Sequence, residues 1–271
     1  MSSENNLSGR TVLITGGTRG LGREMALCLA RAGATLCITG TKRSDDFYKT
    51  TSELASISGD NNFIAEIVNV CDRKATTDFV DLCIAKFFKI DVLINNAGRG
   101  MRLVSEKFNT IPTKFWEADP VAWSTIVNTN INGPFYATLA VVPHMIREKF
   151  GKIINISTSA QTMVRSGYSP YGPTKAFLEA ASRVWSQDLD GTGVDVNVLL
   201  PGGAADTDLL PPSNNKKGAD GNLLPASIMN DAIVWLVSDE SNGISGRRFI
   251  GRYWNNLDFR QDGKGLNPQI M

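Results

Sequence analysis

The chain has 271 residues, of which 42% are hydrophobic and 20% charged, and its formal net charge at pH 7 is +1. This composition is ordinary for a globular protein, and the near-neutral charge gives no general attraction to nucleic acid or to an anionic membrane surface. The N-terminal MSSENNLSGR lacks the charged-then-apolar pattern of a secretion signal, and no apolar run is long enough to span a bilayer.

Seven apolar runs rich in β-branched residues predict strands. They are Thr11–Thr15, Thr35–Thr39, Phe63–Val70, Asp91–Gly98, Lys152–Ser157, Val194–Gly203 and Arg247–Ile250. Helical patterns separate them at Gly22–Ala32, Ala75–Phe88, Ala122–Lys149, Ser169–Leu189 and Pro225–Ser238. Continuous apolar strands that alternate with helices predict an α/β fold with a parallel sheet covered on both faces.

A glycine-rich stretch, ITGGTRGLG, joins the first predicted strand to the first predicted helix. Backbone N–H groups at the start of a helix can face a pyrophosphate. In this arrangement Gly16 permits a tight turn, Gly20 removes a side chain near the phosphates, and Gly22 allows close helix packing. The spacing differs from the common G-x-G-x-x-G, but its place between strand and helix predicts a Rossmann-type dinucleotide site.

The end of the second predicted strand indicates which dinucleotide is preferred. An acidic residue there would bind the ribose 2′-hydroxyl of NAD, but the sequence has Thr41, Lys42 and Arg43. Arg19 lies within the glycine-rich stretch itself. These three cations and the missing acid favour the 2′-phosphate of NADP(H) over NAD(H). The alternative is that Lys42 and Arg43 are solvated loop charges.

The segment YGPTK places Tyr171 and Lys175 four residues apart, on one face of a helix. A cation beside a phenol stabilises the phenolate and lowers its pKa, so this pair predicts an acid–base group. Ser157, Thr158 and Ser159 end the fifth predicted strand, at the sheet edge where ligands bind in open α/β folds. A hydroxyl there can donate to a substrate carbonyl oxygen while the tyrosine protonates it.

Together these motifs resemble the short-chain dehydrogenase/reductase family. The matching segments are TGGTRGLG (Thr15–Gly22), NNAG (Asn95–Gly98), NTNINGPF (Asn128–Phe135), ISTS (Ile156–Ser159), YGPTK (Tyr171–Lys175) and PGG (Pro201–Gly203). The resemblance runs from about residue 8 to about residue 250. It implies one Rossmann-type, doubly wound domain over residues 1–271, with substrate loops at 99–120 and 204–226.

The resemblance implies a catalytic tetrad. Tyr171 would be the acid–base, Lys175 its tuner, and Asn130 would hold a water that connects Lys175 to solvent. For the hydroxyl that orients the substrate oxygen, the family's thirteen-residue step back from the tyrosine reaches Thr158, whereas its usual residue type stands at Ser159. We favour Ser159, with Thr158 as the alternative.

The implied cofactor contacts extend along the chain. The predicted set comprises Gly16, Thr18, Arg19, Gly20, Leu21, Gly22, Thr41, Lys42, Arg43, Asn69, Val70, Asn96, Ala97, Gly98, Tyr171, Lys175, Pro201, Gly202 and Thr207. The expected activity is NADP(H)-dependent interconversion of an alcohol and a ketone or aldehyde. The alternatives are a non-catalytic NADP-binding regulatory protein and a redox-neutral epimerase or dehydratase of the extended branch.

Other features bear on partners and location. His, Cys, Asp and Glu show no zinc spacing, so we expect no metal. The four cysteines form no CxxC pair and lie in apolar contexts, which predicts buried free thiols and a reducing, cytoplasmic setting. We expect a small-molecule partner, neither nucleic acid nor membrane, and a homodimer or homotetramer through Ala122–Lys149 and Ser169–Leu189.

Overall fold

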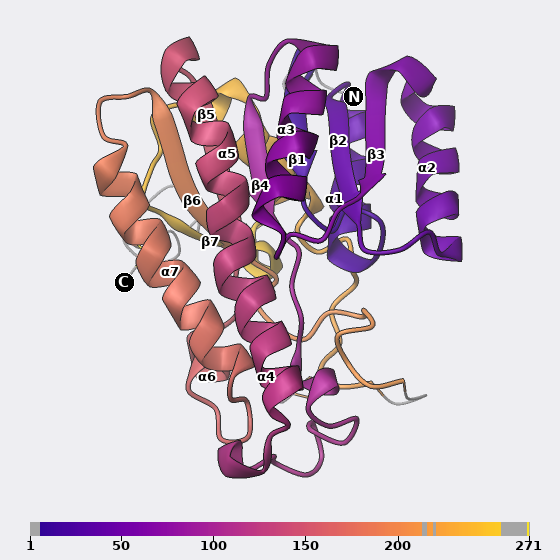
Figure 1. The fold of residues 1–271 in the computed structure, drawn as a ribbon, viewed down its shortest axis with the longest axis vertical. Helices are drawn as coiled ribbons and strands as arrows, with labels where there is room; N and C mark the ends of the chain where they lie inside the picture. Colours follow the sequence, from indigo (N-terminus) through magenta and orange to yellow (C-terminus); the bar gives the residue numbers. More distant parts are fainter. Residues whose placement is uncertain (1–5, 213–215, 219–220, 256–269, 271) are drawn as a thin grey trace.

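The chain folds around one parallel sheet. The computed structural model describes residues 6–212, 216–218, 221–255 and 270, and its seven strands lie in the order β3-β2-β1-β4-β5-β6-β7 (Figure 1). The strands are β1 Thr11–Ile14, β2 Thr35–Gly40, β3 Phe63–Ile67, β4 Val92–Asn95, β5 Gly151–Ile156, β6 Val194–Leu200 and β7 Arg248–Ile250. The predicted doubly wound sheet is confirmed, and its strand order reverses between β1 and β4.

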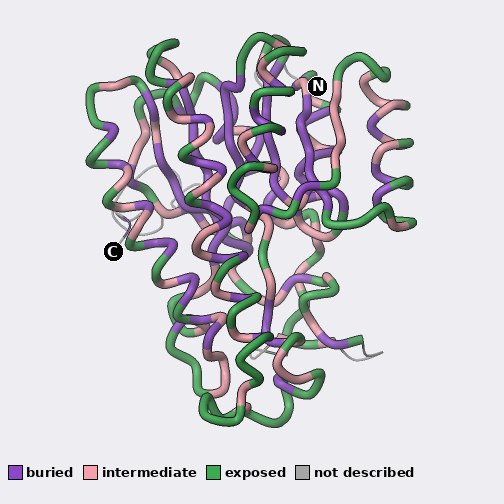
Figure 2. The backbone as a smooth tube through the Cα atoms, in the orientation of Figure 1, coloured by how far each residue is buried: buried purple, intermediate pink, exposed green. Residues whose placement is uncertain are grey.

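Helices cover both faces of the sheet. They are α1 Gly20–Arg31, α2 Asp45–Ser58, α3 Arg73–Phe87, α4 Pro120–Val127, α5 Gly133–Glu148, α6 Ala160–Met163, α7 Tyr171–Asp188 and α8 Asn230–Val237. One buried cluster joins α1 and α8 to Ile14 and Ile94 of the sheet. A second joins α3 and α5 to Leu13 and Leu93 on the opposite face. The central strands β1, β4, β5 and β6 are accordingly the most continuously buried part of the described chain (Figure 2).

The helices differ from the predicted pattern at three places. Helix α2 was not predicted; Ser44 caps it by accepting a hydrogen bond from the Phe47 N–H, and Asp45 and Asp46 stand in its first turn. The short helix α6 was not predicted either. The long helix predicted over Ala122–Lys149 is divided into α4 and α5 by a π-helical turn, Asn128–Asn132, a feature that often marks functional sites.

Within the described part of the chain, none of the helices has both the length and the apolar character needed to cross a bilayer, and no cluster of three or more His, Cys, Asp or Glu could hold a metal. All four cysteines are free thiols. Cys37 and Cys83 are buried as predicted, whereas Cys28 and Cys71 are only half-buried; Cys28 packs against the edge of the cluster around α1 and α8.

Candidate active site

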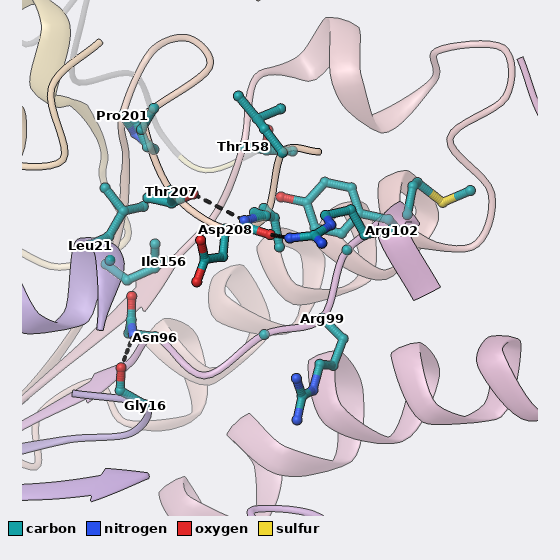
Figure 3. A pocket seen from close by; sticks show the side chains of 18 of the residues that line it. Gly16, Leu21, Asn96, Arg99, Arg102, Ile156, Thr158, Pro201, Thr207 and Asp208 are labelled. Atoms are coloured by element: carbon teal, nitrogen blue, oxygen red, sulfur yellow. Dashed lines mark hydrogen bonds between the residues drawn. The ribbon is translucent and has the colours of Figure 1, made fainter. Parts of the chain in front are cut away.

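A cavity of about 1460 Å³ opens at the carboxyl ends of the central strands (Figure 3). This edge, at the point where the strand order reverses, is where open α/β sheets bind ligands. The cavity brings together most of the predicted site residues: Gly16, Thr18, Arg19, Gly20, Leu21, Gly22, Thr41, Asn69, Val70, Asn96, Ala97, Gly98, Thr158, Ser159, Tyr171, Lys175, Pro201, Gly202 and Thr207. Lys42, Arg43 and Asn130 are not among its lining residues.

The turn after β1 and the first turn of α1 each require a glycine. Gly16 has a φ of +66°, in the left-handed region that favours glycine. A Cβ on Gly22 would lie 2.2 Å from the Gly16 carbonyl oxygen and 2.4 Å from Asn96 Nδ2. Asn96 Nδ2 itself donates to the Gly16 carbonyl at 2.9 Å, so it ties the turn to the end of β4.

The N-terminus of α1 opens beside this turn. The residue that precedes the helix, Arg19, makes no side-chain cap, and the first turn contains no acidic residue. The first N–H groups of a helix need acceptors, and they favour an anion. The glycine cradle and this uncapped helix start therefore fit the pyrophosphate of a dinucleotide.

The groups near the predicted 2′-phosphate position separate into two sets. Arg19 and Thr41 line the cavity, and Arg19 Nη1 lies 3.3 Å from Asp208 Oδ2. Arg43 instead approaches Glu66 at 4.0 Å and lies over the Phe47 ring. The second strand thus turns Thr41 toward the cavity and Arg43 toward β3.

Tyr171 is the first residue of α7, so the sheet edge and the helix start fix its position. Burial raises the pKa of Tyr171 to about 12, and a hydrogen bond with the Thr158 side chain opposes this rise. The phenol and the Thr158 side chain therefore lie near each other in the cavity that both residues line. The sequence led us to expect a lowered pKa, and in the structure the burial of the phenol outweighs the hydrogen bond that stabilises its anion.

Lys175 lies one helical turn after Tyr171 and is buried. Its Nζ donates to the Ile156 carbonyl at 2.7 Å, at the end of β5. Burial lowers the pKa of Lys175 to about 8, although the nearby Glu179 carboxylate raises it. The ammonium is thus held against the sheet beneath the cavity, with its proton only weakly retained.

The two candidate hydroxyls after β5 have different partners. Ser159 Oγ caps α6: it accepts from the Thr162 N–H at 3.2 Å and shares a hydrogen bond with Thr162 Oγ1 at 2.9 Å. Thr158 meets Tyr171 instead. Ser159, which the sequence favoured, is thus the cap of α6, whereas Thr158, the alternative, lies beside the Tyr171 phenol. A serine directly before the helical pattern AQTM was the signal for that cap.

Asn130 lies fully buried in the π-helical turn. Its Nδ2 donates to the Arg99 carbonyl at 2.9 Å and to Thr174 Oγ1 at 3.0 Å, and its Oδ1 accepts from the Arg99 N–H at 2.8 Å. Both amide donors are therefore used, and only Oδ1 keeps a free lone pair for a water. The π turn, which carries the side chain inward, has no signal that we recognised in the sequence.

The two predicted substrate loops meet above the cavity. Arg102 Nη1 donates to the Asp208 carbonyl at 2.7 Å (Figure 3), and a Cβ on Gly100 would lie 2.7 Å from Leu209 Cδ1. Tyr168 packs edge-on against Phe108 with ring centroids 5.5 Å apart. Sequence reasoning did not find these contacts because they join segments from separate strand ends.

Comparison with known proteins agrees with this architecture. The family model described as short chain dehydrogenase matches residues 10–218. A 3-oxoacyl-[acyl-carrier-protein] reductase of Thermotoga maritima is 30% identical over 249 residues, which cover 89% of this chain and 95% of the relative. An NADP-dependent 3-hydroxy acid dehydrogenase of Escherichia coli is 33% identical over 211 residues, 78% of each chain.

A solved structure shares the fold. It is a crystal structure of a Sinorhizobium meliloti protein assigned provisionally to the short-chain alcohol dehydrogenases, with a TM-score of 0.77 and 24% identity, and the match covers 92% of this chain and 96% of that one. The family match extends over most of the chain and includes the glycine turn, Tyr171 and Lys175. The chain therefore belongs to the short-chain dehydrogenase family, and it is an NAD(P)-dependent oxidoreductase that acts on CH–OH and carbonyl groups.

Proposed function

We propose that the protein is an NADP(H)-dependent oxidoreductase that interconverts an alcohol with a ketone or aldehyde in this cavity. The observation that carries the proposal is that Tyr171, Thr158 and Lys175 line one cavity, with Lys175 one helical turn after Tyr171 and held by the Ile156 carbonyl. A bound NADP(H) would supply or accept the hydride at the substrate carbon. The relatives described as NADP-dependent support this choice of cofactor.

The three side chains have separate roles in reduction. Thr158 donates a hydrogen bond to the carbonyl oxygen, and Tyr171 donates the proton that the product alcohol keeps. A phenol with a pKa of about 12 holds its proton at neutral pH, so the described state suits proton donation. The ammonium of Lys175 places a positive charge near Tyr171 and Thr158. The free lone pair of Asn130 Oδ1 can accept a hydrogen bond from a water.

The choice between the two hydroxyls is testable by paired substitutions. Thr158→Val keeps the side-chain shape but removes the hydroxyl, and we expect it to lower kcat by about 10²-fold because a transition-state hydrogen bond is lost. Ser159→Ala removes a helix cap, and we expect a destabilisation of about 1 kcal/mol with nearly unchanged kcat. Steady-state kinetics and thermal unfolding of both variants measure this. A larger kcat loss in Ser159→Ala than in Thr158→Val contradicts the assignment.

The pH dependence should follow Lys175. Its pKa of about 8 means that it is an ammonium below that pH and an amine above it. We therefore expect kcat/KM for carbonyl reduction to fall as pH rises through about 8. In Lys175→Arg the charge persists at all accessible pH, so the decrease near pH 8 should disappear whatever the variant's absolute rate. A wild-type profile that stays flat from pH 7 to pH 10 contradicts this role.

We also propose a homodimer or homotetramer assembled through α4, α5 and α7. These helices expose apolar side chains that no other described segment covers: Val121, Phe135, Leu139, Ile146, Phe177 and Val184. Apolar side chains exposed along neighbouring helices favour association of copies of the chain. Light scattering at micromolar concentration should give at least twice the chain mass of 29.4 kDa, and a monomer contradicts the proposal.

The cytoplasmic location stays a prediction.

The activity itself is tested with both reduced cofactors in parallel. The panel comprises ketones, aldehydes, sugars and 3-oxoacyl thioesters, each assayed with NADPH and with NADH, and with Tyr171→Phe as the control. Turnover that depends on Tyr171 and prefers NADPH supports the proposal and gives the substrate class. NADPH binding without turnover across the panel favours a regulatory protein instead.

A further inference from the structure

A largely buried ion pair lies beside the peptide of Thr158, the residue that carries the proposed catalytic hydroxyl. Arg248 Nε donates to both carboxylate oxygens of Glu179, at 3.1 and 3.0 Å. The Arg248 side chain is 14% exposed and that of Glu179 only 4%. Arg248 belongs to β7 and Glu179 to α7, so the pair joins the last strand to the helix that begins with Tyr171.

The same guanidinium reaches the segment after β5. Arg248 Nη2 donates to the Thr158 carbonyl oxygen at 3.0 Å. Thr158 lies two residues beyond the end of β5, where Ser157 still pairs with β6 through its N–H and Ser159 already caps α6. The Thr158 peptide thus lies between the sheet and the next helix, and the guanidinium holds it there.

Stability does not explain this pair well. Taking two charges out of water costs free energy that their attraction offsets only in part, and an apolar pair of similar volume often serves as well. Arginine differs from lysine here, because its planar fork can hold a carboxylate and a carbonyl in fixed directions at once. The contacts of the Arg248 guanidinium therefore suit a side chain whose role is to fix the orientation of the Thr158 peptide.

We propose that Arg248 is a positioning residue, which acts through the Thr158 carbonyl to aim the Thr158 hydroxyl into the cavity that Tyr171 also lines. This inference rests on the proposed function, since it gives Thr158 its orientation for the substrate oxygen. Glu179 orients the guanidinium from α7. Arg248 contacts Glu179 on one side and the Thr158 carbonyl on the other. The pair therefore links α7, the helix of Tyr171 and Lys175, to the peptide of Thr158.

Substitution tests separate this role from simple charge compensation. Arg248→Met leaves the buried Glu179 carboxylate unpaired and can fail to fold, so the decisive variant is the double substitution Glu179→Met/Arg248→Met. It removes both charges and keeps the volume. Because Glu179 also raises the pKa of Lys175, kcat is measured well below pH 8, where Lys175 keeps its proton. We expect the melting temperature to stay near that of the wild type, while kcat for reduction falls about 10- to 100-fold through misplacement of the hydroxyl.

The controls use the residues beside the pair. Arg247→Met changes the exposed arginine that precedes Arg248 in sequence; its kcat should stay within about threefold of the wild type, because the contact of Arg248 with the Thr158 carbonyl persists. The single variant Arg248→Lys should have a higher kcat than the double variant Glu179→Met/Arg248→Met, though a lower one than the wild type. The KM for NADPH should not change in any of them. A double variant with wild-type kcat overturns the inference, since Arg248 then only neutralises Glu179.

Hydrogen exchange gives a readout that does not need turnover. In the double variant, amides of residues 158–162 should exchange at least about tenfold faster than in the wild type, because the segment loses the bond that holds it. Unchanged exchange there overturns the inference even if kcat falls. A wild-type protein without turnover across the panel refutes the proposed reaction instead, and the exchange rates still decide whether Arg248 holds this segment.

Discussion

Replacing Tyr171 with Phe is expected to lower kcat for carbonyl reduction by about 10³-fold or more, because a positioned proton donor contributes roughly 10²- to 10⁴-fold. The substitution removes one oxygen atom and keeps the ring, so the start of α7 should remain folded. The hydroxyl is not part of the glycine cradle or of the uncapped start of α1. The dissociation constant for NADPH should therefore stay within about threefold of the wild type.

A neighbouring tyrosine provides the matched control for this experiment. Tyr168 lines the same cavity and stands three residues earlier in the chain, but its ring packs on Phe108 and under Arg165. Tyr168→Phe also loses a phenol oxygen, but from a residue that lines the cavity and has no assigned role in proton transfer. Its kcat should therefore fall less than about tenfold. Steady-state rates and fluorescence titration with NADPH measure both variants. Equal losses in the two, or more than a tenth of wild-type kcat in Tyr171→Phe, contradict the assignment.

The sheet could be predicted because its central strands β1, β4, β5 and β6 are buried on both faces along most of their length. Such strands are continuous apolar runs, and the segments TVLI and KIINI show this pattern directly. Helix α2 was missed for the opposite reason. It lies at the edge of the fold and buries only Phe47, Thr50 and Leu54, so few apolar residues mark it in the sequence. Its capping serine and the two aspartates after it were the signals that remained.

The site was predictable only where local sequence fixes it. The glycine turn is local, since Gly22 needs space against Gly16. The roles of Thr158 and Ser159 are not: both hydroxyls follow the same strand, and which of them faces Tyr171 depends on where α6 begins. The contact of Arg248 with Glu179 spans 69 positions, and spacing within one sequence carries no information about such a pair.

The cofactor preference should be reversible through two lining residues. Thr41 follows the end of β2, where an acid would bind a ribose 2′-hydroxyl, and Arg19 supplies a cation from the glycine turn. We expect Arg19→Ser/Thr41→Asp to shift the ratio of kcat/KM for NADPH to that for NADH by about 10³-fold toward NADH. A charge-assisted hydrogen bond to the phosphate is worth about 1.5–3 kcal/mol, and the new carboxylate would add repulsion of the phosphate. Kinetics with both cofactors at constant ionic strength measure the shift.

The same experiment decides between the lining residues and the adjacent strand-end cations. Both Lys42 and Arg43 were predicted from the sequence to bind the phosphate, but Arg43 faces Glu66 and Phe47. Arg43→Ser and Lys42→Ser should therefore change the KM for NADPH less than about threefold, as expected for exposed charges screened by water. The ion pair of Arg19 with Asp208 is also exposed, so it costs little to break when a phosphate competes for the guanidinium. A tenfold rise in the KM for NADPH in Arg43→Ser, with none in Arg19→Ser, would instead put the phosphate on the β3 side of the strand end.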